Sequence, residues 1–159
     1  MRTIEAWVNF PTDASTKGII FGNYKGNPTC MGMEVMTTGV PRFYAHNVDA
    51  SGKATEKNDL RFSDVNLFTG VWTHVVFTID TENACVKLYV NGELAQTVTM
   101  TYTTLLDPAN SYIIGGDRRS KNAAFCPGQI HSVAIYSDVR TADEVAADML
   151  APGADRRPW

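Results

Sequence analysis

The chain lacks the features of a membrane-spanning or nucleic-acid-binding protein. No apolar stretch approaches the roughly 20 residues that a membrane-spanning helix needs. The 14 basic and 17 acidic residues give a formal net charge of −3 and form no long run of one sign. A nucleic-acid-binding surface would need clustered positive charge, so neither a nucleic-acid partner nor membrane insertion is expected. The N-terminus also lacks a secretory signal, and a strand pattern begins at Thr3, as in a domain cut from a longer protein.

Cysteine is scarce and its spacing excludes two common sites. The three cysteines, Cys30, Cys85 and Cys126, form no Cys-x-x-Cys pair, which argues against a zinc site and a thioredoxin-like motif. Only one internal disulfide is available to three thiols. Cys30 and Cys126 each precede an expected strand, so a bridge between them and three free thiols are the two alternatives, which spacing alone does not decide.

Short runs rich in β-branched and aromatic residues recur along the whole chain. They cover residues 3–10, 17–24, 30–37, 40–46, 59–63, 72–80, 85–91, 93–100, 112–116 and 128–136. The pattern predicts an all-β fold of two stacked antiparallel sheets, a β-sandwich of jelly-roll type. Asn91-Gly92 is typical of a type I′ hairpin turn between two of these strands. The polar stretch 47–58 is expected to be a loop, either for binding or as a solvated connection.

One helix is expected, near the C-terminus. Thr141 and Glu144 form a capping box, and Val145, Met149 and Leu150 give an apolar stripe at helical spacing. We expect this short helix to pack on the edge of the sandwich. The length of 159 residues suits one domain over residues 1–150, followed by a Pro- and Gly-containing tail or linker at 151–159.

Two blocks of sequence resemble the LamG-like, concanavalin A-like jelly-roll family. The first block runs from a Trp-x-His-Val strand through a Leu-Tyr-Val strand to an Asn-Gly turn, and the second from Ile-Gly-Gly to a Thr-capped helix. The matching residues are Trp72, His74, Val75, Asp80, Leu88, Tyr89, Val90, Asn91 and Gly92, then Ile114, Gly115, Gly116, Phe125, Gly128, Ile130, Ile135 and Tyr136. The chain departs from the family pattern at Cys126-Pro127, which adds a residue, and at His131, where aspartate is common.

The resemblance implies binding rather than catalysis. Glycoside hydrolases of related fold carry carboxylates at Glu-x-Asp-x-(x)-Glu spacing on one strand, and this motif is absent. A nucleophile elbow, a phosphate-binding glycine loop and a His-x-x-x-His pair are absent as well. We therefore expect a non-catalytic carbohydrate-binding or adhesion module from a larger secreted or cell-surface protein. The alternatives are a structural or protein-interaction module and the accessory domain of a hydrolase.

Strand alternation indicates where a ligand would bind. If the strands at residues 3–10, 72–80 and 85–91 share a sheet, the outer concave face of that sheet carries alternate residues that do not face the core. Those residues are Glu5, Trp7, Trp72, His74, Lys87 and Tyr89. Aromatic side chains beside hydrogen-bonding groups suit sugar rings, so Trp7, Trp72, His74 and Tyr89 are candidate glycan contacts. The alternative is that these aromatics pack beneath loops.

A second candidate site is the loop that follows Gly116. Arg118 and Arg119 concentrate positive charge there, and arginine holds carboxylates or sulfates with two hydrogen bonds, which favours an acidic glycan. A solvated loop is the alternative. Some members of the family bind calcium at the rim of the sandwich, which makes Asp117 and Asn23 candidate ligands of a structural calcium. No cofactor is otherwise required, and the expected partners are a glycan, a cell-surface or matrix protein, and neighbouring domains.

Overall fold

A computed structural model describes residues 2–23, 29–48, 51, 53–105, 111–116 and 125–150 of the chain. Each of the ten expected strands is present. Their bounds are β1 Thr3–Asn9, β2 Gly18–Gly22, β3 Thr29–Val35, β4 Pro41–Val48, β5 Ala54–Arg61, β6 Thr73–Asp80, β7 Cys85–Val90, β8 Glu93–Thr99, β9 Ile113–Ile114 and β10 Gln129–Tyr136, and one helix, α1, spans Ala142–Leu150.

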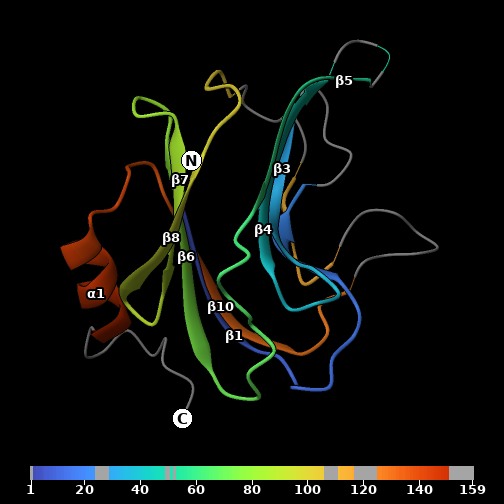
Figure 1. Ribbon diagram of the computed structural model, residues 1–159, viewed down its shortest axis with the longest axis vertical. Coiled ribbons are helices and arrows are strands. Elements are labelled where there is room, and N and C mark those ends of the chain that lie inside the picture. The colour runs from blue at the N-terminus through green and yellow to red at the C-terminus, as the bar shows by residue number, and fades with distance from the viewer. Residues whose placement is uncertain are drawn as a thin grey trace.

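The strands form two antiparallel sheets that lie face to face (Figure 1). One sheet has the order β10-β1-β6-β7-β8 and the other the order β5-β4-β3-β2-β9. Consecutive strands pair along most of both sheets, whereas β1 pairs with two distant strands and lies between β6 and β10. This arrangement confirms the expected β-sandwich.

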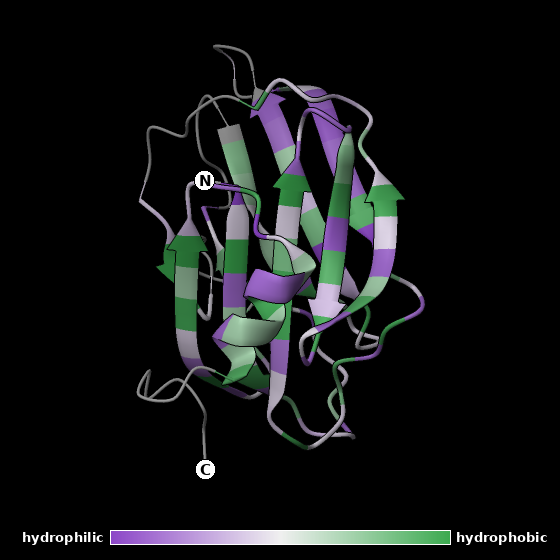
Figure 2. Ribbon diagram, turned by 90° about the vertical axis from the view of Figure 1, so that its left-hand side faces the viewer, coloured by the Kyte–Doolittle hydropathy of each residue, from purple (hydrophilic) through white to green (hydrophobic). Residues whose placement is uncertain are grey.

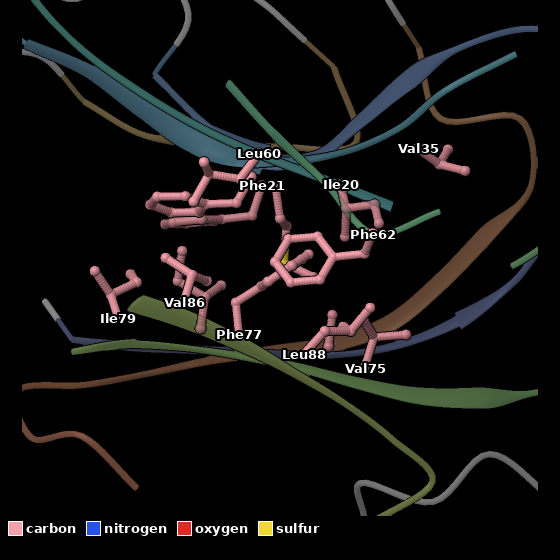
Figure 3. Packing of buried hydrophobic residues seen from close by; sticks show 14 of the residues in the cluster. Ile20, Phe21, Val35, Leu60, Phe62, Val75, Phe77, Ile79, Val86 and Leu88 are labelled. Atoms are coloured by element: carbon pink, nitrogen blue, oxygen red, sulfur yellow. The ribbon is translucent and has the colours of Figure 1, made fainter. Parts of the chain in front are cut away.

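The two sheets meet through side chains that alternate along each strand. From one sheet Ile4, Val75, Phe77 and Leu88 are fully buried between the layers, and from the other Phe43 is. Figure 3 shows this packing, with Phe62 and Leu60 facing Phe77 and Val86 across the gap. The residues predicted to point inward from β1, β6 and β7 all belong to this core or pack against it. Period-two alternation therefore fixes which side chains point outward.

The turn between β7 and β8 confirms the type I′ prediction. Asn91 and Gly92 both have positive φ, at 50° and 83°. The side chain of Asn91 also reaches the neighbouring strand, where its Oδ1 accepts a hydrogen bond from the backbone N–H of His74 at 2.9 Å. The turn thus joins β6 to the β7–β8 hairpin.

Helix α1 lies on the outer face of the β10-β1-β6-β7-β8 sheet (Figure 2). The expected capping box is formed, because Thr141 N donates to Glu144 Oε2 at 2.8 Å and Glu144 N donates to Thr141 Oγ1 at 3.3 Å. Val145 is buried against Val76 and Tyr89. Packing on the sandwich edge was therefore the wrong expectation, and Leu150 is exposed rather than part of the apolar stripe.

The expected loop at residues 47–58 is largely strand. β4 continues to Val48, and β5 begins at Ala54 and includes Asn58. The Asn58 side chain is buried and its polar atoms are paired. Its Nδ2 donates to the carbonyl of Tyr102 at 2.9 Å, and its Oδ1 accepts from the N–H of Thr101 at 2.7 Å. A buried asparagine whose amide oxygen and nitrogen are both hydrogen-bonded can lie within a strand, and the polar composition of residues 47–58 does not reveal this pairing.

The described part of the chain contains no helix with the length and apolar character needed to span a membrane.

Candidate functional site

The two outer faces of the sandwich differ in what lies on them. We call the outer face of the β10-β1-β6-β7-β8 sheet the helix face, and its central residues are Glu5, Trp7, His74, Val76 and Tyr89. The predicted residues do share this face, because β1, β6 and β7 are neighbours and Trp7 pairs with His74 across the strands. Their rings lie 5.1 Å apart.

The helix face does not offer the exposed aromatic surface that strand alternation led us to expect. Trp7, His74 and Tyr89 are all buried, with His74 fully inaccessible. The physical reason is the position of α1, whose Val145 packs on Tyr89 and Val76. A sugar ring needs an accessible aromatic face to stack on, and these three residues present none.

A polar cluster lies beneath the helix. Glu5 Oε1 lies 3.3 Å from Nε2 of His74, and Glu5 Oε2 accepts a hydrogen bond from the Tyr136 hydroxyl at 3.0 Å. The guanidinium of Arg140 lies 4.1 Å above the Tyr136 ring and pairs with Asp148 of α1 at 2.9 Å. These contacts connect the sheet to the helix through buried charge and explain why polar residues lie on a covered face.

Trp72 remains partly accessible at the end of the helix face. It precedes β6, and its ring meets that of His131 edge to face at 6.0 Å. His131 is exposed and is the extra residue of a β-bulge, since Ser132 pairs with Trp7 while Ile130 pairs with Val8. Trp72 is thus the one predicted aromatic whose surface is still open to a ligand.

The opposite sheet carries an array of charged and polar side chains on its outer face. We call this the polar face, and its residues are Glu34, Arg42, Tyr44, His46, Lys57, Asp59 and Arg61. The register places Glu34, Arg42 and Arg61 side by side on β3, β4 and β5. Sequence reasoning did not single these residues out, although the alternation in residues 40–46 would have marked them, because Phe43 and Ala45 are buried between them.

Arg42 organises the polar face. Its Nη1 donates to Glu34 Oε2 at 2.6 Å, while Nε and Nη2 donate to the two oxygens of Asp59 at 2.7 and 2.8 Å. Burial favours a lower pKa for Arg42, but its hydrogen bonds and ion pairs with Asp59 and Glu34 outweigh this effect and raise the pKa. The same hydrogen bonds hold the pKa of Asp59 below its usual range. Lys17 approaches Glu34 at 3.9 Å and Arg61 approaches Asp59 at 3.8 Å.

Tyr44 and His46 follow Arg42 along the same side of β4. Tyr44 lies across two glycines, and a Cβ on Gly32 would stand 2.7 Å from its hydroxyl, so the close approach requires glycine there. Burial, and next the positive charge of Arg42, lower the pKa of His46, which keeps the imidazole neutral near pH 7. A neutral imidazole both donates and accepts hydrogen bonds. The polar face thus combines fixed charges with a neutral hydrogen-bonding group.

The remaining predicted site residues give a mixed picture. Arg118, Arg119 and Asp117 lie outside the described residues. Asn23 is buried, and its Oδ1 accepts a hydrogen bond from the N–H of Met31 at 2.6 Å, so the side chain links the two ends of the β2–β3 connection. Among the described residues no three His, Cys, Asp or Glu side chains gather as metal ligands.

The alternative of a Cys30–Cys126 bridge is not realised. None of the three cysteines is in a disulfide bond, and Cys30 is buried. Burial raises the pKa of the Cys126 thiol to about 12, so the reactive thiolate is suppressed there.

Comparison with known sequences identifies one family. A sequence model described as the concanavalin A-like lectin/glucanases superfamily matches residues 2–146. This span includes all ten strands and the first part of α1. No curated protein matches the chain.

Solved structures with the same fold include carbohydrate-binding domains. Domain 4 of a GH43 extracellular arabinanase from Geobacillus stearothermophilus, solved with arabinotriose, is 21% identical, with a TM-score of 0.63 over 92% of this chain and 65% of that one. The CBM40 of a Ruminococcus gnavus IT-sialidase is 20% identical, with a TM-score of 0.63 over 93% of this chain and 82% of that one. A SAP-like pentraxin from Limulus polyphemus is 15% identical, with a TM-score of 0.61 over 92% and 68%. At these identities the likeness establishes the fold.

Proposed function

Because the chain belongs to the concanavalin A-like lectin/glucanase superfamily, we propose that it is a non-catalytic carbohydrate-binding module that binds glycans through its polar face. The observation that carries the proposal is the Arg42 array, in which one buried guanidinium aligns Glu34 and Asp59 with three hydrogen bonds. Of the two carboxylates Asp59 is the exposed one, with 42% of its side chain accessible. Because Arg42 holds it in place, it is pre-oriented for hydroxyl groups, which lowers the entropic cost of binding.

The contrast between the two faces supports this location. The one helix among the described residues lies on the helix face, where Trp7, His74 and Tyr89 are buried. On the polar face Asp59, Lys57 and Arg61 are exposed beside the partly buried His46. Two structural neighbours were solved with arabinotriose and with α2,6-sialyllactose, which favours a sugar as the ligand class here as well.

The absence of a catalytic motif from the sequence supports a binding role without catalysis. The carboxylates of the polar face, Glu34 and Asp59, are both engaged by Arg42, so neither is placed as a free acid and nucleophile pair. We extend the proposal to an extracellular or cell-surface location, because the arabinanase neighbour is described as extracellular. A parent protein with further domains and a rim calcium held by Asp117 belong to the same proposal.

A glycan array probed with the purified chain tests the proposal. Saturable binding is expected, and His46→Ala should weaken it while His131→Ala leaves it unchanged, because the two histidines lie on opposite sheets. The predicted contacts Trp72, Arg118 and Arg119 enter the same experiment as alanine variants. If Trp72→Ala abolishes binding and His46→Ala does not, the ligand lies on the helix face at the Trp72–His131 pair, and the proposed location is wrong.

A protein-interaction module is the second candidate function. It is favoured by the exposed hydrophobic side chains of Ile114 and Phe125, with 58% and 70% of their surface accessible. If no glycan binds and a flanking domain of the parent protein does, this second function replaces the first.

A further inference from the structure

The polar face carries a surplus of positive charge although the chain as a whole is acidic. Four cationic side chains, those of Arg42, Lys57 and Arg61 together with the adjacent Lys17, meet two carboxylates, Glu34 and Asp59. The complete chain has a formal net charge of −3. Because His46 is held neutral, it adds no further charge near pH 7. Positive charge is therefore concentrated on this side of the described structure.

The two carboxylates are already neutralised from within the protein. Glu34 is almost fully buried against Arg42, and both oxygens of Asp59 accept from the same guanidinium. Arg42 donates through three of its nitrogens, and its side chain is only 11% exposed, so it supports the array rather than reaching a ligand. Lys57 and Arg61 on β5 are both exposed to a ligand: 62% of the Arg61 side chain is accessible, and its Nε lies 3.8 Å from Asp59. Lys17 instead approaches the buried Glu34 at 3.9 Å.

Strand geometry sets the distance between these two cations. Lys57, Asp59 and Arg61 alternate on the same side of β5, which is an edge strand of its sheet. At about 3.3 Å per residue, the Cα atoms of Lys57 and Arg61 lie roughly 13 Å apart. This spacing fits acid groups on separate units of one oligosaccharide better than a single small anion.

We propose that the ligand of the polar face is an acidic glycan, bearing carboxylate or sulfate groups, and that Arg61 and Lys57 on β5 contact those groups. The inference rests on the proposed function and names its ligand class. Arg61 is suited to two parallel hydrogen bonds with a carboxylate or sulfate, and Lys57 to a point contact. A neutral glycan could accept hydrogen bonds from both side chains but would form no ion pair with either.

The experiment uses the full chain against three sets of oligosaccharides: carboxylated, sulfated and neutral. The carboxylated and sulfated sets distinguish the two sources of negative charge. Lys57→Gln and Arg61→Gln, singly and together, remove the positive charge and keep a polar side chain that can still hydrogen-bond. Lys87→Gln is the matched control, because Lys87 alternates with the buried Val86 and Leu88 and lies on the other sheet.

We expect binding by one acidic set, with affinity reduced about tenfold or more in the double variant and unchanged in Lys87→Gln. Affinity should also fall as salt rises from about 0.05 to 0.5 M, because the Debye length shortens. Equal binding of neutral glycans, or acidic binding that survives the double variant, overturns the inference while the glycan-binding function stands. No glycan binding by any set overturns both.

Discussion

The two outer faces of the sandwich carry similar residue types, but these residues are covered by a helix on one face and not on the other. The helix face places Glu5 and His74 beside aromatic rings and covers them with α1. The polar face places Glu34 and Asp59 around Arg42 on a sheet that bears none of the described helix. Charged and aromatic residues on a strand therefore indicate a binding surface only after the element that covers the strand is known.

The largest effect is expected when the buried cluster of the helix face is broken. His74→Ala leaves Glu5 buried with the Tyr136 hydroxyl as its described polar contact and opens a cavity beside Trp7. The free energy of unfolding should fall by about 3–5 kcal/mol. Urea denaturation measures this loss. His131→Ala is the control, and because His131 is exposed its free energy of unfolding should stay within about 0.5 kcal/mol of the wild-type value. Equal losses in the two variants would show that the buried cluster does not stabilise the fold.

The polar face should respond less to the loss of its central residue. Arg42→Ala leaves Glu34 buried near Lys17, which is 3.9 Å away, so the expected destabilisation is about 2–4 kcal/mol. Arg42→Lys keeps the positive charge but not the three hydrogen bonds. Its free energy of unfolding should lie between those of the wild-type protein and Arg42→Ala. Arg61→Ala should change stability by less than about 0.5 kcal/mol, because the ion pair is exposed. A large loss in Arg61→Ala would mean that the face is structural throughout.

The docking of α1 should depend on one side chain. Val145→Ala removes two methyl groups from the contact with Val76 and Tyr89, at a cost of about 1–2 kcal/mol. Hydrogen exchange of the α1 amides should accelerate in this variant. Leu150→Ala, at an exposed position of the same helix, should leave exchange unchanged. Identical exchange in both variants would contradict the packing described for the helix.

The smallest effect concerns pH and the polar face. The pKa of His46 is lower in the folded protein than in the unfolded chain, so the unfolded chain binds the proton more readily. Stability should therefore fall as the pH drops through the ordinary range of histidine, near about 6.5, and continue to fall until the folded pKa is passed. His46→Gln should flatten this slope in denaturation curves recorded from about pH 8 to 5. An unchanged slope would exclude His46 as its source.

The sequence predicts the sandwich well because alternation is a local signal. Alternation over a few residues predicts that Phe77 and Leu88 face the core, and two adjacent residues, Asn91 and Gly92, predict the turn. The structure has both features. The position of α1 was not predictable in the same way. The capping box of Thr141 and Glu144 fixes where the helix begins. No residue pattern within the helix indicates which face of the sheet it covers.

The candidate site was missed for the same reason. The outward direction of Trp7 and His74 follows from alternation, whereas their burial depends on a helix about 70 to 140 residues away in sequence. Arg42 carries no motif, because its role arises from partners on β3 and β5 that only the sheet register brings together. The register of strand pairing is the information that a single sequence does not display.

The central position of β1 has a consequence for how the chain reaches its fold. Thr3 pairs with Thr78 on one side and with Tyr136 on the other. During synthesis β1 therefore emerges well before its partners β6 and β10. Closing such long loops before any contact is gained slows folding. Until β10 has left the ribosome, β1 has an open edge that another nascent chain can pair with. The β10-β1-β6-β7-β8 sheet is therefore complete only once β10 can pair with β1.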